Sequence, residues 1–106
     1  MLEKITTHQS EEDSRNRSIF IYLDGKLVPR EKATVSVYDS GFMLGDGIWE
    51  GLRLFDGSWI FLDEHIDRLL EAALAIDLNI AMDKKGIIEA LEITRQKNKM
   101  LSLIHI

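Results

Sequence analysis

Apolar and polar positions first organise into two short runs that flank an Asp-Gly pair. The runs cover residues 18–23 and 26–29, and Asp24-Gly25 separates them. Because Asp-Gly accepts the positive φ angles of a type I′ turn, this pattern predicts a β-hairpin. Pro29 has no N–H to give to a neighbouring strand, so we expect it at a strand end or on a sheet edge.

The same pattern returns further along the chain, where residues 48–55 and 58–62 flank Asp56-Gly57. It predicts a second hairpin. Between the hairpins, residues 33–38 form another strand-like run, and the Gly- and Asp-rich stretch that follows, residues 39–47, predicts an ordered connecting loop. Two hairpins in one short chain predict an antiparallel sheet.

The second half of the chain changes to helical spacing. Asp63 is a predicted N-cap, and the helix after it is expected to end near residues 77–79. Its apolar positions are Ile66, Leu69, Leu70, Ala73 and Ile76. Asp83 is a second predicted N-cap, with Asn98 as the stop of the second helix. The sequence therefore predicts an α+β fold, in which two helices cover one face of an antiparallel sheet with hairpins.

Composition narrows the classes of function. The chain has 106 residues, 45% of them hydrophobic, which suits one domain with one core. Zero cysteines remove thiolate metal sites and fit a reducing compartment. A net charge of −5, without a Lys and Arg stripe, argues against nucleic acid. No apolar run reaches the roughly 20 residues that span a bilayer, so we expect no membrane partner and a cytoplasmic protein.

Both ends of the chain differ from its middle. Residues 1–17 are polar, carry charges of both signs and show no period, so we expect a flexible leader before a domain at residues 18–100. Residues 101–106, L-S-L-I-H-I, are apolar with no polar break before them. They equal the translation of a common sequencing-adapter end, which predicts a non-native tail. The alternative is a genuine β-strand that begins there.

Several motifs are rejected on their spacing. Gly45, Gly47 and Gly51 form G-x-G-x-x-x-G, one residue longer than a dinucleotide fingerprint, and strand-like residues follow where a helix should start. The three histidines, His8, His65 and His105, have no metal-ligand spacing. Ser36, Ser40 and Ser58 have no histidine in a nucleophile context. We therefore predict no metal and no catalytic residue from these groups.

Arg68 and Trp49 each have an ordinary structural interpretation. Arg68 lies roughly 200° from the apolar face of its helix, with Glu64 and Glu71 at i−4 and i+3, so a solvated salt-bridge face would explain it. Trp49 alternates with its neighbours in a strand-like run, so its ring could fill the core of the sheet. Arg53 could form an inter-strand or interface ion pair.

The series G-D-G at 45–47, E-G-L-R at 50–53 and D-E-H-I-D-R-L at 63–69 resembles the small N-terminal domain of class IV, fold-type IV pyridoxal-phosphate enzymes. The resemblance extends over residues 19–100. It implies that Arg68 binds the phosphate of pyridoxal 5′-phosphate and that Trp49 walls the substrate pocket. It implies no catalytic role for His65. The E-G-x-R segment is most similar to branched-chain-amino-acid aminotransferases.

The resemblance also implies a larger enzyme. In the family, the Schiff-base lysine lies in a second, C-terminal domain, so none of the lysines here inherits that role and this chain alone is expected to be inactive. The implied activity is transfer of an amino group between an amino acid, favoured as a branched-chain L-amino acid, and a 2-oxo acid, by a homodimer. A D-amino-acid aminotransferase, an aminodeoxychorismate lyase and a complete, non-catalytic α+β binding module remain alternatives.

Overall fold

The first hairpin forms as the sequence predicts. The computed structural model describes residues 14–100, and in it β1 (Phe20–Leu23) pairs antiparallel with β2 (Lys26–Pro29). Asp24 and Gly25 have φ angles of 51° and 83°, as a type I′ turn requires. Pro29 lies at the strand end opposite Phe20, so its expected position is confirmed.

The second hairpin also forms, but its strands are shorter than predicted. They are β3 (Arg53–Phe55) and β4 (Ser58–Ile60), joined by Asp56 and Gly57 with φ angles of 48° and 79°. Residues 48–52 approach β3 without pairing, because no neighbouring strand among residues 14–100 lies beside them. The two hairpins form separate two-stranded sheets, where we had expected one sheet.

The segment between the hairpins differs most from expectation. Residues 33–38 form no strand, and Val35 and Val37 are each 65% exposed, because this run has no partner strand within residues 14–100. The predicted loop contains a short helix, α1 (Ser40–Leu44). Asp39 caps α1 by accepting a hydrogen bond from the N–H of Gly41 at 3.0 Å, and Gly45 ends it with φ 69°.

Two long helices follow the second hairpin. The first, α2 (Leu62–Ala75), begins after Phe61, whose φ of 51° turns the chain from β4 into the helix. The prediction that Asp63 caps α2 is wrong, since Asp63 lies inside the first turn, and α2 ends before residues 77–79 because Asp77 has a φ of 57°. The second, α3 (Lys84–Lys97), begins at Asp83, which accepts from the N–H of Gly86 at 2.8 Å, and ends at Asn98, both as predicted.

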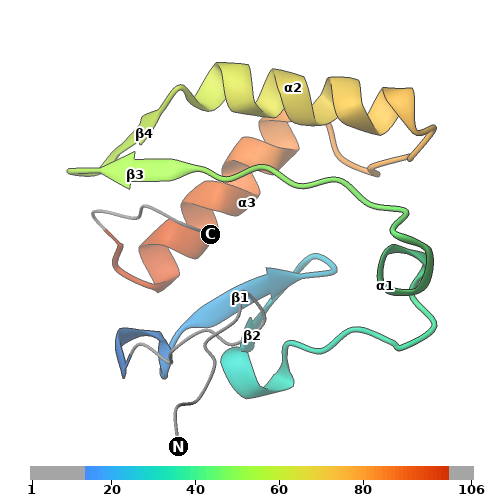
Figure 1. The fold of residues 1–106 in the computed structure, drawn as a ribbon. Helices are drawn as coiled ribbons and strands as arrows, with labels where there is room; N and C mark the ends of the chain where they lie inside the picture. The colour runs from blue at the N-terminus through green and yellow to red at the C-terminus, as the bar shows by residue number, and fades with distance from the viewer. Residues whose placement is uncertain (1–13, 101–106) are drawn as a thin grey trace, which may run out of the picture.

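The elements stack around α3 (Figure 1). This helix contacts β1 of the first hairpin and also contacts α2, while β3 and β4 lie beside α2. A short 3-10 helix, η1 (Ser14–Asn16), precedes β1, and another, η2 (Arg30–Lys32), follows β2. The predicted α+β class with antiparallel hairpins and two main helices is confirmed.

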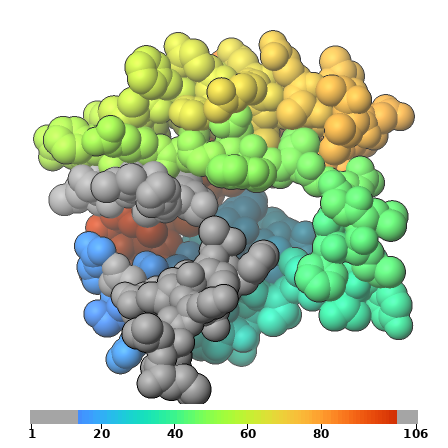
Figure 2. Space-filling view, viewed as in Figure 1, coloured from blue at the N-terminus to red at the C-terminus, as the bar shows by residue number. Residues whose placement is uncertain are grey.

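The core is small and lies between the second hairpin and α2. Its buried side chains are Leu52, Leu54, Ile66 and Ala73. Large apolar side chains elsewhere are exposed, several of them along residues 35–49, the green segment that runs down one side of the molecule in Figure 2. Leu52 and Ile66 therefore fix the backbone next to Glu50 on one side and next to Arg68 on the other. This places the candidate site at the edge of the core.

Candidate functional site

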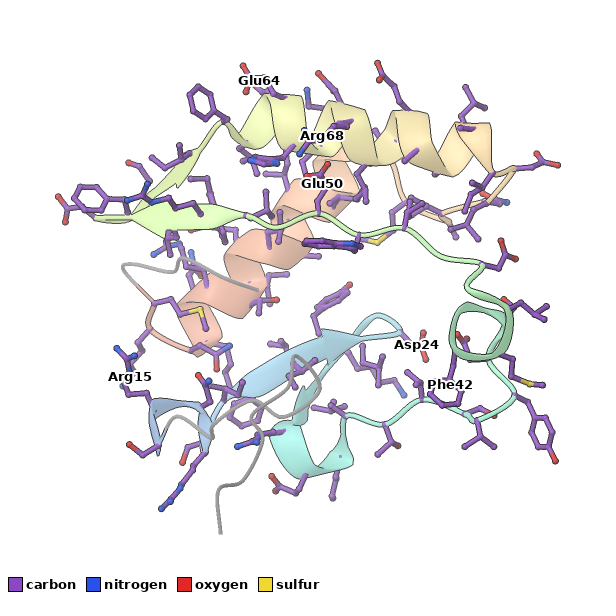
Figure 3. The ribbon with its side chains drawn as sticks, in the orientation of Figure 1. Arg15, Asp24, Phe42, Glu50, Glu64 and Arg68 are labelled. Carbon is purple, nitrogen blue, oxygen red and sulfur yellow. The ribbon has the colours of Figure 1, made fainter. Side chains whose placement is uncertain are left out.

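Glu50 and Arg68 come from different elements and face each other (Figure 3). Glu50 lies in the segment that leads into β3, and Arg68 lies in the second turn of α2. Arg68 donates from Nε to Oε1 of Glu50 and from Nη2 to Oε2, the latter at 2.8 Å. Two parallel N–H bonds to one carboxylate form the geometrically specific, bidentate pair that arginine favours.

His65 completes the cluster. Its Nδ1 lies 2.8 Å from Oε2 of Glu50 and 3.4 Å from Nη2 of Arg68. An ionised carboxylate only accepts hydrogen bonds, so Nδ1 of His65 carries a hydrogen and donates a hydrogen bond to Glu50. In the neutral ring this leaves Nε2 as the acceptor. One oxygen of Glu50 thus accepts from both His65 and Arg68.

The charges in this cluster reinforce one another. The hydrogen bonds from Arg68, and then from His65, lower the pKa of the Glu50 carboxyl to about 2. The hydrogen bond to Glu50 raises the pKa of Arg68. Both groups are therefore ionised at neutral pH. The Glu50 side chain is 9% exposed, whereas that of Arg68 is 68% exposed.

An open pocket of about 270 Å³ lies over the first two turns of α2, lined by Phe61, Glu64, His65 and Arg68. Phe61 is placed there by its left-handed backbone, which is uncommon for a bulky residue. The N–H groups at the start of a helix carry partial positive charge. A guanidinium beside them suits an oxyanion such as a phosphate or a carboxylate, whereas the Glu64 carboxylate opposes one.

The structure confirms that Arg68 points away from the core, but the ion partners expected from its own helix are wrong. Neither Glu64 nor Glu71 pairs with Arg68 within residues 14–100, and Glu50 does so instead. Helical spacing alone could not find Glu50, because it lies 18 positions away and outside the helix. The one signal for it was its place in the E-G-x-R segment.

Trp49 does not fill a core. The residue is 81% exposed, and it is not among the residues that line the pocket. Its ring lies over Gly51, where an added Cβ would come within 3.2 Å of the ring. The core interpretation is wrong because residues 48–52 are not part of a sheet. Arg53, exposed on β3, forms no ion pair within the described part of the chain.

Two further polar clusters hold elements together. Lys84, in the first turn of α3, contacts Asp67 of α2 at 2.9 Å and Asp63 at 3.2 Å. Glu92 of α3 accepts from Arg95 and from the indole N–H of Trp59 in β4, at 3.3 Å, and the bonds from Arg95 and Trp59 lower its pKa to about 2. These contacts tie α3 to α2 and to the second hairpin.

Residues 14–100 lack both a metal-binding cluster and a membrane-spanning helix. His, Asp and Glu form no group of three that could hold a metal ion there. None of the helices in the same range combines the length and the apolar character needed to cross a membrane.

Comparisons with known proteins converge on one enzyme class. The chain is 41% identical over 80 residues to a putative branched-chain-amino-acid aminotransferase of Methanocaldococcus jannaschii, covering 76% of this chain and 28% of that protein. It is 43% identical over 72 residues to a D-alanine aminotransferase of Listeria monocytogenes, covering 68% and 25%. The chain therefore spans about a quarter of the length of these curated relatives. No protein-family model matches it.

Solved structures agree. A branched-chain aminotransferase of Thermoproteus uzoniensis with norvaline superposes with a TM-score of 0.72 at 31% identity, over 79% of this chain and 30% of that one. A second branched-chain amino acid aminotransferase, complexed with N-(5′-phosphopyridoxyl)-L-glutamate, gives a TM-score of 0.75 at 25% identity, over 80% of this chain and 30% of that one.

Proposed function

Because the chain belongs to the class IV aminotransferases, we propose that it forms the small N-terminal domain of a pyridoxal-phosphate-dependent transaminase. The full-length enzyme moves an amino group between an amino acid and a 2-oxo acid. Branched-chain L-amino acids are the favoured substrates, supported by the names of the Methanocaldococcus relative and of both structural neighbours. We also propose that the full-length enzyme is a homodimer in the cytoplasm.

The observation that carries the proposal is the position of Arg68. It borders the pocket at the start of α2, and its guanidinium keeps N–H groups that no residue among 14–100 takes up. A permanently charged fork with spare donors can hold a phosphate without consuming a proton. The residues present therefore fit the phosphate end of pyridoxal 5′-phosphate, with Arg68 as the residue that binds it.

The remainder of the cofactor site is assigned to the part of the enzyme outside this chain. The bound cofactor supplies the electron sink that makes amino-group transfer possible. Lys26, Lys32, Lys84, Lys85, Lys97 and Lys99 belong to the hairpin, to the short helix after it, to α3 or to the turn beyond it. None of these lysines borders the pocket, so we propose that the chain alone has no transaminase activity.

Trp49 is proposed as a wall of the substrate pocket. Its exposure leaves most of the indole ring available for packing by another part of the enzyme, and a rigid apolar surface suits the side chain of an aliphatic amino acid. The ring rests on Gly51, which has no side chain to displace it.

A second candidate function is a D-amino-acid aminotransferase, because the Listeria relative with that name is 43% identical. The cofactor contact would be the same in both enzymes. They would differ in the groups that hold the substrate carboxylate and in the hand of the amino acid.

Recovering the uninterrupted transcript and assaying its product tests the proposal. We expect coding sequence that continues into a lysine-bearing domain, and a product that converts L-leucine with 2-oxoglutarate. Turnover of D-alanine in its place would favour the second candidate. A transcript that ends after Ile106, with a folded product that gains no absorbance from added pyridoxal phosphate, would favour a non-catalytic module and contradict the proposal.

A further inference from the structure

The guanidinium of Arg68 presents two edges with different roles. The edge formed by Nε and Nη2 is occupied by the two oxygens of Glu50. The other edge is formed by Nη1 and Nη2. Its Nη1 has no hydrogen-bond partner in the described part of the chain. An arginine has five N–H donors, so a carboxylate on one edge leaves enough donors on the other for a second oxyanion.

Glu50 is the fixed member of this pair. Its side chain is 9% exposed, whereas the Arg68 side chain is 68% exposed and would otherwise be free to change rotamer. Leu52, two positions after Glu50, and Ile66, two positions before Arg68, are both buried in the core. The backbone on both sides of the ion pair is therefore held by packing, and Glu50 transmits that order to the guanidinium.

His65 adds a second restraint on the same carboxylate. Its Nδ1–H donates to Oε2 at 2.8 Å, the oxygen that also accepts from Nη2 of Arg68. A carboxylate with hydrogen bonds on both oxygens has little rotational freedom. His65 thus fixes the orientation of Glu50, and Glu50 fixes that of Arg68.

A second carboxylate allows the effect of charge to be separated from the effect of contact. Glu64 lines the same pocket but makes no hydrogen bond with Arg68 among the described residues. Removing the charge of either glutamate should favour a bound anion. Only the loss of Glu50 releases the guanidinium.

We propose that Glu50 is a positioning residue for the cofactor: it holds the Nε–Nη2 edge of Arg68 so that the Nη1–Nη2 edge is kept ready for the phosphate. This inference rests on the proposed function. Glu50 does not touch the phosphate, and its contribution is made through Arg68. The E-G-x-R segment thereby gains a physical role for its glutamate.

The test is the dissociation constant of pyridoxal 5′-phosphate, titrated into the full-length apoenzyme. Glu50→Gln should raise it about tenfold, the lower end of what loss of an outer hydrogen-bond partner costs at metal sites. Glu50→Asp, which keeps the charge but is one methylene too short for both contacts, should raise it as well. Glu64→Gln should lower it, by roughly twofold.

A spectroscopic signature accompanies the affinities. The ³¹P resonance of the bound cofactor should shift or broaden in Glu50→Gln and stay at its wild-type position in Glu64→Gln. If Glu50→Gln does not fold, Glu50→Asp and its ³¹P spectrum carry the test. Tighter binding in both Gln variants, or wild-type binding in Glu50→Asp, would overturn the positioning role.

Arg68→Ala distinguishes the phosphate contact of Arg68 from the positioning role of Glu50. Unchanged cofactor affinity in Arg68→Ala would refute the proposed phosphate contact itself. Weakened affinity in Arg68→Ala, together with wild-type affinity and an unmoved ³¹P resonance in Glu50→Asp, would refute only the role of Glu50.

Discussion

Asn98 binds both backbone groups of Phe20, 78 positions away. Its side-chain oxygen accepts from the N–H of Phe20 at 2.7 Å, and its Nδ2 donates to the Phe20 carbonyl at 2.9 Å. The same Nδ2 donates to the carbonyl of Thr94 at 2.9 Å, which caps the end of α3. One amide therefore ends the helix and pairs with the outer edge of β1.

Replacing Asn98 with Ala should lower the free energy of unfolding by about 2 kcal/mol, because it leaves partly buried backbone groups of Phe20 without partners. Urea unfolding of the chain measures this. The control is Asn79→Ala, an exposed asparagine between the two main helices, which should change the free energy by less than about 0.5 kcal/mol. Equal effects of the two variants would show that the Phe20 contacts contribute nothing.

Acid should destabilise the chain through Glu50 and Glu92. The pKa of each carboxyl is lowered from 4.5 to about 2, so each contributes stability above its unfolded value and loses that contribution as the pH falls through the folded one. We expect the urea midpoint to fall between about pH 4.5 and pH 2. The double variant Glu50→Gln, Glu92→Gln should show a shallower fall. An identical pH profile in this variant would contradict the assigned pKa values.

Gly45 should tolerate alanine less well than Gly47. Gly45 ends α1 with a φ of 69°, a left-handed conformation that costs an alanine roughly 1 kcal/mol. Gly47 lies two residues further in the same loop, has no positive φ and has space for a Cβ, whose nearest neighbour would be 3.9 Å away. Thermal unfolding should therefore distinguish Gly45→Ala from Gly47→Ala. A larger loss in Gly47→Ala would contradict the assigned cap.

Trp49 should matter for substrate and little for folding. Because Trp49 is 81% exposed, Trp49→Ala should change the stability of the chain by less than about 0.5 kcal/mol. In the full-length enzyme it should raise the KM for the amino acid, by about tenfold. Trp59→Ala, which removes a hydrogen bond to Glu92, should show the reverse pattern: lower stability and a nearly unchanged KM. A strong folding defect in Trp49→Ala would refute the pocket role.

Much of the fold follows from local signals. The Asp-Gly pairs predict both hairpins, and Asp83 and Asn98 predict the start and the end of α3. These signals suffice because turns and caps depend on a few neighbouring residues. Residues 33–38 show the limit of such signals: an alternating run becomes a strand only beside another strand, and none lies there within residues 14–100. The prediction that the hairpins pair into one sheet was wrong, because pairing between hairpins also depends on which elements lie side by side and not on local residues.

The candidate site was predictable only in part. Helical spacing predicted the exposure of Arg68, since a residue far from the apolar face of a helix points to solvent. Its role at the cofactor phosphate is implied by the resemblance of the segment around it and is a proposal. Its ion partner was not predictable from helical spacing, because Glu50 lies 18 positions away, in the segment that leads into β3. The left-handed backbone of Phe61, a residue that lines the pocket, had no signal in the sequence.

Whether Arg68 binds the cofactor phosphate is measured by the dissociation constant of pyridoxal 5′-phosphate in the full-length enzyme. Arg68→Ala should raise this constant at least about tenfold, since hydrogen bonds to charged groups contribute roughly 1.5–3 kcal/mol each. Arg68→Lys should recover part of the loss. Lys85→Ala, which removes an exposed cation at the start of α3, should have no effect. Wild-type affinity in Arg68→Ala would leave Arg68 as a surface ion pair with Glu50 and contradict the account.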